Sequence, residues 1–296
     1  MQSVYGDGQP AGIPRDTVRR PPGAEGVARH YDVLDRHYRE IWGEHVHHGL
    51  WLDPRDLPER ATRQLVELAA GLAGVRAGSR VCDVGCGYGA TARLLVDELG
   101  AQVTGITVSL AQLRYGQARA RGENPRLVLG DWLDNGLPSE SFDAVLAIES
   151  VSHMHERPRV FAECLRVLRP GGRLVVLDWL AAEATRRWQR RLLLDPICRA
   201  GHLPRLDSLR QYGEMLQRAG FEGVTGRDLS AQVWRTWPWV LRLGGRRMVS
   251  DAQLRRLVVD PRHEEREFLG LIAYLMAGYA TRSFRYGLLS ARRGAV

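Results

Sequence analysis

The residues most suited to chemistry lie at positions 81–89, where an apolar run meets closely spaced glycines. This run, Val-Cys-Asp-Val-Gly-Cys-Gly-Tyr-Gly, includes Asp83 and then Gly85, Gly87 and Gly89, and residues 90–99 follow with helical spacing. Glycine is typical of places where the backbone turns sharply against a ligand, because a Cβ atom would clash there. A strand, a glycine turn and a helix in this order form the nucleotide crevice of a doubly wound sheet. The segment therefore predicts a cofactor that contains adenosine.

Two cofactors are compatible with this turn. Its first residues match the G-x-G-x-x-G/A fingerprint of dinucleotide enzymes, which place an acid about 20 residues later to hold the ribose. The next apolar run, 102–109, instead carries hydroxyls near its end, on Thr107 and Ser109. Asp83 also precedes the glycines, where a carboxylate suits an ammonium better than a pyrophosphate. The local charge thus favours S-adenosylmethionine over a nicotinamide dinucleotide.

The later apolar runs support the same type of sheet. Residues 126–130 lead into Asp131 and Trp132. The Asp131 carboxylate could accept a hydrogen bond from an adenine amino group, and the Trp132 indole could offer the adenine ring a flat apolar surface. The helical pattern of 158–168 is followed by Pro and two glycines, which return the chain to a strand. Seven strands are expected, near residues 80–84, 102–106, 126–130, 142–148, 173–178, 222–228 and 284–290.

The motif order resembles the class I S-adenosylmethionine-dependent methyltransferases over roughly residues 75–180. The motifs are D-V-G-C-G-Y-G at 83–89, G-I-T-V-S at 105–109, G-D-W at 130–132, F-D-A-V at 142–145 and R-P-G-G-R-L at 169–174. A narrower likeness, to the tocopherol C-methyltransferase group with its bacterial natural-product and sugar methyltransferases, covers most of the chain. It rests on I-W-G-E-H-V-H-H-G at 41–49, A-I-E-S-V-S-H-M at 147–154, L-L-D-P-I-C at 193–198, W-P-W at 237–239 and F-R-Y-G-L-L at 284–289.

The resemblance implies an α/β, Rossmann-like fold with a seven-stranded, mostly parallel sheet whose last strand is antiparallel. It also implies S-adenosylmethionine as cofactor, with S-adenosylhomocysteine as product. The expected cofactor residues are Asp83, Gly85, Cys86, Gly87, Gly89, Thr107, Ser109, Gln112, Asp131, Trp132, Leu133, Glu149 and Trp42. Trp42 is expected to close the N-terminal segment over the methionine end of the cofactor.

Methyl transfer is an in-line displacement at an activated sulfonium carbon, so the protein chiefly supplies alignment, desolvation and, for some acceptors, a base. The candidate catalytic residues are Glu149, His153, His48 and Tyr31. Histidine suits proton transfer near neutral pH, whereas Glu149 could equally orient its neighbours. We also hypothesise that Glu149 is the final proton acceptor after methylation of an isoprenoid. The ligand count and spacing around His48 predict no metal site.

Long stretches between the expected strands indicate a helical cap. The stretches 179–206 and 229–281 exceed ordinary connections of about 4–6 residues. A cap over the strand ends would line a mostly apolar pocket. The expected substrate-pocket residues are Tyr38, Trp179, Trp234, Trp237, Tyr274 and Tyr279. They predict a hydrophobic acceptor, such as a prenylated aromatic, a terpenoid or a polyketide-like compound.

The chain divides into three expected parts. Residues 1–25 are rich in Gly and Pro and predict a mobile tail, which could exchange between subunits of a homo-oligomer. Residues 26–74 predict a helical segment that closes the cofactor site, and residues 75–296 form the core with its two cap insertions.

Composition indicates a cytoplasmic protein without a membrane span, since no apolar run approaches 20 residues. The four cysteines are scattered without CxxC pairs and are expected to be reduced. The net charge is +8 and every basic residue is arginine. These arginines recur along the whole chain without a nucleic-acid-binding motif, so a small molecule is the expected partner rather than DNA or RNA.

The sequence therefore predicts methyl transfer to a hydrophobic small molecule, with carbon favoured over oxygen or nitrogen as the acceptor atom. An O- or N-methyltransferase of a natural product or sugar is the nearest alternative. A nicotinamide-dependent oxidoreductase would share the glycine turn. A protein that binds S-adenosylmethionine without transferring its methyl group would share the whole cofactor site.

Overall fold

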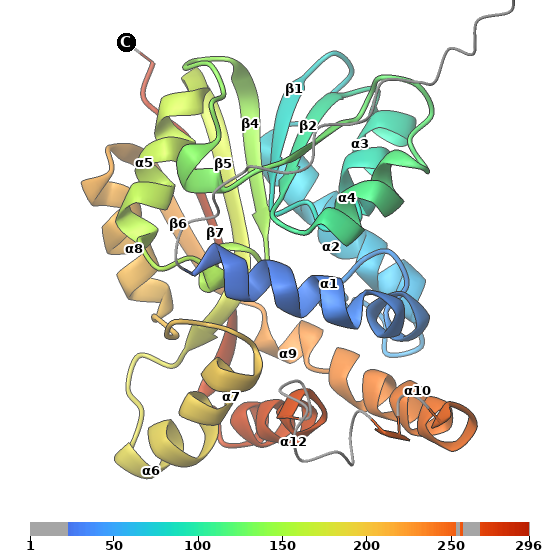
Figure 1. The fold of residues 1–296 in the computed structure, drawn as a ribbon. Coiled ribbons are helices and arrows are strands. Elements are labelled where there is room, and N and C mark those ends of the chain that lie inside the picture. The colour runs from blue at the N-terminus through green and yellow to red at the C-terminus, as the bar shows by residue number, and fades with distance from the viewer. Residues whose placement is uncertain (1–22, 253–254, 257–266, 296) are drawn as a thin grey trace, which may run out of the picture.

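A seven-stranded sheet with helices on both faces forms the centre of the computed structural model (Figure 1). The structure describes residues 23–252, 255–256 and 267–295, so the predicted tail lies outside it except for residues 23–25. The strand order is β3-β2-β1-β4-β5-β7-β6, and β7 alone runs antiparallel to its neighbours. The predicted fold class is confirmed. The strands are β1 (Arg80–Val84), β2 (Gln102–Thr107), β3 (Arg126–Leu129), β4 (Phe142–Ile148), β5 (Leu168–Ala181), β6 (Phe221–Asp228) and β7 (Phe284–Arg293).

The sheet is buried on both faces because its central strands are apolar at successive positions. In β4, Leu146 packs into the cluster on one face, while its neighbour Val145 packs into the cluster on the other. The first face is covered by α2 (Pro58–Ala73) and α3 (Ala90–Leu99), and the second by α5 (Arg157–Val167) and α8 (Leu209–Arg218). Short helical turns η1 (Trp132–Asp134) and η2 (Val151–His153) follow β3 and β4.

The N-terminal helix α1 (Ala24–Ile41) crosses the carboxyl ends of the parallel strands (Figure 1). The carboxylate of Asp32 accepts hydrogen bonds from the Ser109 hydroxyl at 2.5 Å and from the Ala111 backbone N–H at 3.1 Å. These contacts hold α1 against the start of α4 (Leu110–Gln117). Asp35 also accepts from the Tyr88 hydroxyl at 2.9 Å. The helix is therefore attached to the core next to the glycine turn.

Both predicted cap stretches contain helices, which pack together beyond α1 (Figure 1). After β5 come α6 (Arg187–Gln189), η3 (Arg190–Leu194) and α7 (Asp195–Ala200); after β6 come α9 (Ser230–Val233), α10 (Thr236–Ser250) and α12 (Glu267–Ala280). Ile197, Trp237 and Leu275 belong to one buried apolar cluster that joins α7, α10 and α12. Among the described residues, no helix has the length and apolar character needed to cross a bilayer.

A buried arginine fastens the loop that leads from the cap to α8. The Arg157 side chain is fully buried and donates to the Asp207 carboxylate at 2.6 Å. It also donates to the backbone carbonyls of Ser152 at 2.8 Å and Arg205 at 2.7 Å. This guanidinium therefore joins η2, which carries His153, to the loop before α8.

We expect Arg157→Met to lower the free energy of unfolding by about 3 kcal/mol, because it leaves the buried Asp207 carboxylate with only its contact to Arg205. Urea denaturation measures this change. The matched control, Arg159→Met, breaks only an exposed pair with Glu156 and should leave stability nearly unchanged. Equal small effects of the two substitutions would contradict the structural role of Arg157.

Candidate active site

The glycine turn requires glycine because of its backbone shape and its close neighbours. Gly85, Gly87 and Gly89 have φ angles of 72°, 54° and 70°, which side-chain-bearing residues rarely adopt. A Cβ atom at Gly85 would lie 2.4 Å from the Ser150 Cβ atom. The turn is also held to β2, because the Cys86 backbone N–H donates to the Ile106 carbonyl at 2.9 Å. At the three glycines no side chain covers the backbone of the turn, and the hydrogen bond to β2 holds the turn in place.

This turn forms one wall of a cavity of about 170 Å³ beside the carboxyl ends of β1, β2, β3 and β4. Helix α1 closes the opposite side through Val27 and Tyr31, and η2 contributes His153. Ten of the predicted cofactor residues lie in the wall: Asp83, Gly85, Cys86, Gly87, Thr107, Gln112, Asp131, Trp132, Leu133 and Glu149. A cavity at the carboxyl ends of parallel strands is the usual ligand site of this fold.

Asp83 carries a buried carboxylate that lacks a donor. Its side chain is 2% exposed, and Oδ2 has no hydrogen-bond partner among the described residues. Burial raises the pKa of Asp83 to about 7. The nearby Ser150 hydroxyl is buried without a hydrogen-bond partner in the same wall. Because a buried polar group without a partner is costly, these two groups fit the ammonium and carboxylate of an amino-acid ligand.

The other end of the cavity suits a flat ring system. Trp132 is 2% exposed, and its indole N–H donates to the Val160 carbonyl at 3.1 Å, which fixes the plane of the ring. One carboxylate oxygen of Asp131 accepts from the Leu133 backbone N–H at 2.8 Å. Between the two ends, the Thr107 hydroxyl donates to the Gln112 side-chain carbonyl at 2.9 Å. The amide nitrogen of Gln112 lies near Gly87, 3.8 Å from the position that a Cβ atom would take there.

Three predicted cofactor residues, Ser109, Gly89 and Trp42, do not line this cavity. Ser109 is fully buried, because its hydroxyl binds Asp32 and caps α4 rather than facing a ribose. Gly89 precedes α3, and a Cβ atom there would lie 2.7 Å from Leu127, so packing explains this glycine. Trp42 lines a neighbouring cavity instead.

That second cavity, of about 50 Å³, lies under α1 and next to the first. The two share Tyr31, Val46, His47, Glu149 and His153. The predicted pocket residues Tyr38, Trp179 and Trp237 line the second cavity together with Trp42 and Leu271. Its wall is thus mostly aromatic, and it meets the cofactor cavity along the five shared residues.

Three predicted substrate residues lie elsewhere. Trp234, in the turn between α9 and α10, is 41% exposed, and Tyr274 of α12 is 38% exposed. Tyr279 is outside the wall and contacts it indirectly, through a hydrogen bond of 3.1 Å to His48 Nε2. Sequence reasoning in turn missed the wall residues His47 and Ser150, although both directly adjoin residues it had selected.

Glu149 is the most highly coordinated side chain at the junction of the cavities. Its Oε1 accepts from the His48 backbone N–H at 2.6 Å, from His48 Nδ1 at 2.9 Å and from the Tyr286 hydroxyl at 2.9 Å. Its Oε2 accepts from the Trp179 indole N–H at 2.6 Å. Burial opposes ionisation, but the contacts with His48 outweigh it and lower the pKa of Glu149 to about 2. The carboxylate is therefore a weak base that orients its four donors.

His48 has both ring nitrogens engaged. Nδ1 donates to Glu149, so the proton resides there, and Nε2 accepts from the Trp237 indole N–H at 2.8 Å. The ring is 1% exposed. His48 consequently links the carboxylate to the aromatic wall of the second cavity and acts as a positioning residue.

His153 and Tyr31 are joined by a hydrogen bond that a bound acceptor hydroxyl could replace. Tyr31 Oη lies 3.2 Å from His153 Nε2, while His153 Nδ1 faces the His202 carbonyl at 3.4 Å. Nδ1 therefore carries the proton and Nε2 is an acceptor, and the His153 residue lines both cavities. Burial, assisted by His30, lowers the pKa of His153 to about 4. The imidazole is therefore neutral at pH 7 and keeps an acceptor nitrogen, but with this pKa it is a weak base.

The ring nitrogens of His45 and His47 bind each other and the backbone of their own loop. His45 Nδ1 lies 3.2 Å from His47 Nε2, and His47 Nδ1 donates to the His48 carbonyl at 2.8 Å. Burial lowers the pKa of His45 to about 3 and also lowers that of His47. These rings therefore brace the loop between α1 and α2.

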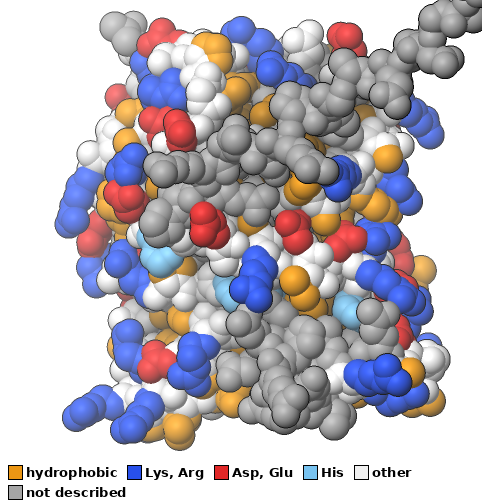
Figure 2. Space-filling model, in the orientation of Figure 1, with side chains coloured by type: hydrophobic (Ala, Val, Ile, Leu, Met, Phe, Trp, Pro, Cys, Tyr) orange, Lys and Arg blue, Asp and Glu red, His pale blue; other side chains and the backbone are white. Residues whose placement is uncertain are grey.

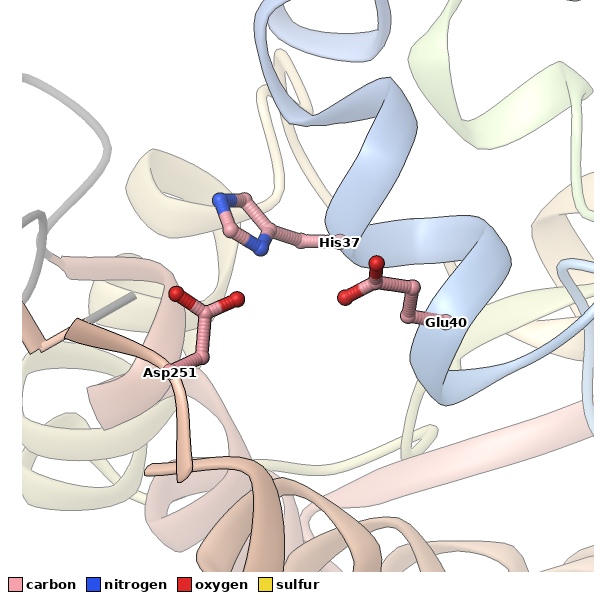
Figure 3. Close-up of side chains that lie close together, drawn as sticks. All are labelled: His37, Glu40 and Asp251. Atoms are coloured by element: carbon pink, nitrogen blue, oxygen red, sulfur yellow. The ribbon is translucent and has the colours of Figure 1, made fainter. Parts of the chain in front are cut away.

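A separate group of possible metal ligands joins α1 to the end of α10 (Figure 3). His37, Glu40 and Asp251 place one ligand atom each within 4.8 Å of the others. Both carboxylates have arginine partners: Arg36 lies 2.9 Å from Glu40 and 3.8 Å from Asp251, and Arg247 lies 3.6 Å from Glu40. Since two guanidinium groups already compensate the carboxylates, we interpret this group as an ion-pair network between the two helices.

The raised pKa of Asp83 predicts that binding of the expected cofactor releases a proton. An ammonium requires the ionised carboxylate, so the affinity for S-adenosylhomocysteine should rise as the pH increases toward about 7 and level off above it. Asp83→Asn should bind on the order of tenfold to a hundredfold more weakly and lose this pH dependence. Calorimetry in buffers of different ionisation enthalpy measures both effects. An affinity that is equal at acidic and neutral pH would contradict the role of Asp83.

Comparisons with known proteins agree with this geometry. A family model described as "Methyltransferase domain" matches residues 82–176. The chain is 31% identical over 241 residues to the chloroplastic tocopherol O-methyltransferase of Arabidopsis thaliana, covering 74% of this chain and 69% of that protein. It is 33% identical over 221 residues to the 27-O-demethylrifamycin SV methyltransferase of Amycolatopsis mediterranei, covering 73% and 80%.

The solved structure of the [4+2]-cyclase SpnF superposes with a TM-score of 0.77 at 26% identity, covering 93% of this chain and 98% of that one. The motifs, the orphaned carboxylate at the glycine turn and these relatives lead to one assignment. The chain belongs to the class I S-adenosylmethionine-dependent methyltransferases, in the group that contains tocopherol and bacterial natural-product methyltransferases, and it uses S-adenosylmethionine as its cofactor.

Proposed function

We propose that this methyltransferase transfers the methyl group to a hydroxyl oxygen of a hydrophobic small molecule. The observation that carries the proposal is the Tyr31–His153 pair in the wall shared by the two cavities. In the proposed step, the acceptor oxygen forms a bond to the methyl carbon as the carbon–sulfur bond breaks. The hydroxyl proton passes to His153 Nε2, and S-adenosylhomocysteine leaves. The neutral imidazole can accept that proton at Nε2, and it is a stronger base than the Glu149 carboxylate.

The character of the second cavity supports a hydrophobic acceptor. Apolar and aromatic side chains form part of its wall, and such surfaces bind flat or prenylated compounds; histidines, Glu149 and Ser152 supply the polar part. Its 50 Å³ holds little more than one or two water molecules. An acceptor of this class is larger than the second cavity, so its binding requires this cavity to widen or the acceptor to extend into the adjoining first cavity. The names of the two methyltransferase relatives, which refer to tocopherol and a rifamycin, are consistent with acceptors of this class.

Methyl transfer to carbon is the second candidate. It is favoured by the ionised Glu149 beside the aromatic rings of Trp179 and Trp237, since a carboxylate and aromatic faces both stabilise a cation formed on an alkene. Glu149 is less suited to the final proton transfer that the sequence suggested, because four donors already occupy its oxygens and its pKa is about 2. The oxygen acceptor therefore takes precedence.

We expect His153→Ala to lower kcat by a factor on the order of 10² to 10⁴ while leaving the affinity for S-adenosylhomocysteine unchanged. Tyr31→Phe should have a smaller effect, because the imidazole remains. In the unaltered enzyme, kcat should fall as the pH decreases through about 4, where His153 becomes protonated and loses its acceptor nitrogen. Assays use a panel of prenylated phenols and polyketides, with release of S-adenosylhomocysteine and product mass as readouts.

A cofactor labelled with ¹³C in the methyl group identifies the acceptor atom, because methyl carbons on oxygen and on carbon differ in chemical shift. A new signal for a methyl group on carbon would establish the second candidate instead. Conversion of an acceptor without release of S-adenosylhomocysteine would indicate a reaction of another kind, such as cyclisation, and would overturn the proposed function.

A further inference from the structure

The helical stretch after β5 presents apolar and basic side chains to solvent together. Trp188 is 46% exposed and Leu192 is 59% exposed, one helical turn apart. The same stretch of chain carries five exposed arginines: Arg186, Arg187, Arg190, Arg191 and Arg199. None of these five forms an ion pair with a described residue, and Asp195 is the single acid between positions 186 and 200. Large apolar side chains surrounded by uncompensated cations are an unusual surface for a freely diffusing protein.

Helix α10 repeats this combination on its outer face. Leu241 is 50% exposed and Val249 is 82% exposed. Arg242 and Arg246 are exposed beside them, and neither has an acidic partner among the described residues. No Asp or Glu occurs within α10 itself, Thr236–Ser250. The helix therefore has one side buried against α7 and α12, and an outer side that carries arginines and apolar side chains.

Both surfaces lie at the same end of the molecule. In Figure 1, α6 and α10 stand at the lower left and lower right, with α12 between them, beyond the carboxyl ends of the strands. Figure 2 shows basic side chains at both lower corners of this face. The aromatic cavity lies directly above these helices, since Trp237 of α10 and Leu271 of α12 form part of its wall. We call this end the cap surface, defined by Trp188, Leu192, Leu241, Val249 and the seven arginines named above.

We propose that the cap surface docks on an anionic lipid bilayer, with Trp188 and Leu192 entering the headgroup region. Arginines attract anionic headgroups, and each basic residue near such a surface contributes on the order of 1 kcal/mol of attraction. Indole and leucine side chains are typical of interfacial helices that insert shallowly into a bilayer. Nucleic acid would satisfy the arginines but would leave the aliphatic Leu192, Leu241 and Val249 exposed to water. The inference does not depend on which acceptor atom is methylated.

The test is co-sedimentation of the full-length protein with vesicles of phosphatidylcholine, with and without phosphatidylglycerol. Binding is expected only with the anionic lipid, and it should weaken as the salt concentration rises. Arg190→Gln with Arg191→Gln should weaken binding on the order of tenfold to thirtyfold. Trp188→Ser should also weaken it. Brominated lipids should quench the fluorescence of the unaltered protein more than that of Trp188→Phe, because only the former inserts this indole.

The matched control removes two exposed arginines far from the cap, Arg121→Gln with Arg126→Gln, for the same change in net charge. Arg126 begins β3 at the amino ends of the parallel strands, opposite the cap surface. The control should bind vesicles like the unaltered protein, and affinity for S-adenosylhomocysteine confirms that every variant is folded. Absence of vesicle binding at low salt, equal loss in the control, or binding to single-stranded RNA but not to vesicles would each overturn the proposal.

Discussion

The contacts of the Glu149 carboxylate hold the active site of this methyltransferase together. Its donors come from three separate parts of the chain: the N-terminal segment at His48, the end of β5 at Trp179 and strand β7 at Tyr286. Glu149 itself has a φ angle of 52°, an unfavourable conformation for a side-chain-bearing residue. Four hydrogen bonds to one ionised group stabilise that strained position.

The pKa values of the two buried carboxylates of the site are shifted in opposite directions, and the difference follows from their hydrogen-bond donors. Glu149 has four donors and a pKa lowered to about 2, whereas Asp83 lacks a donor on Oδ2 and has a pKa raised to about 7. A satisfied carboxylate organises the protein around it, while an unsatisfied one binds a ligand that supplies the missing donor. The ammonium of S-adenosylmethionine is such a ligand. Environments of this kind commonly assign distinct roles to similar groups in one site.

The cap connects the site to the outer surface of the molecule. Trp237 contacts His48 on its inner side, while Leu241 of the same helix, α10, is exposed on the outer side. The ion-pair network of Glu40, Asp251 and Arg247 holds the end of this helix to α1. A shift of α10 that admits an acceptor would therefore also change the contact between α1 and the cap.

The sequence by itself determined the sheet, the glycine turn and the cofactor, because these depend on local signals: apolar runs, glycine spacing and the residue next to the turn. The reversed last strand was implied only by the resemblance to the methyltransferase family, and β7 confirms it. The sequence did not predict the direction in which individual side chains point. Ser109 turned out to bind Asp32, 77 residues away, and Trp234 and Tyr274 turned out to face solvent.

Only the tertiary structure decided which candidate base is available. From residue type alone, His48, His153 and Glu149 are all candidates for the base. Contacts with Trp237 and Tyr286, from distant parts of the chain, occupy His48 and Glu149, whereas His153 keeps an exchangeable partner in Tyr31, 122 residues away. A hydrogen bond between distant residues depends on how whole elements pack, and no local pattern in a single sequence encodes that distance.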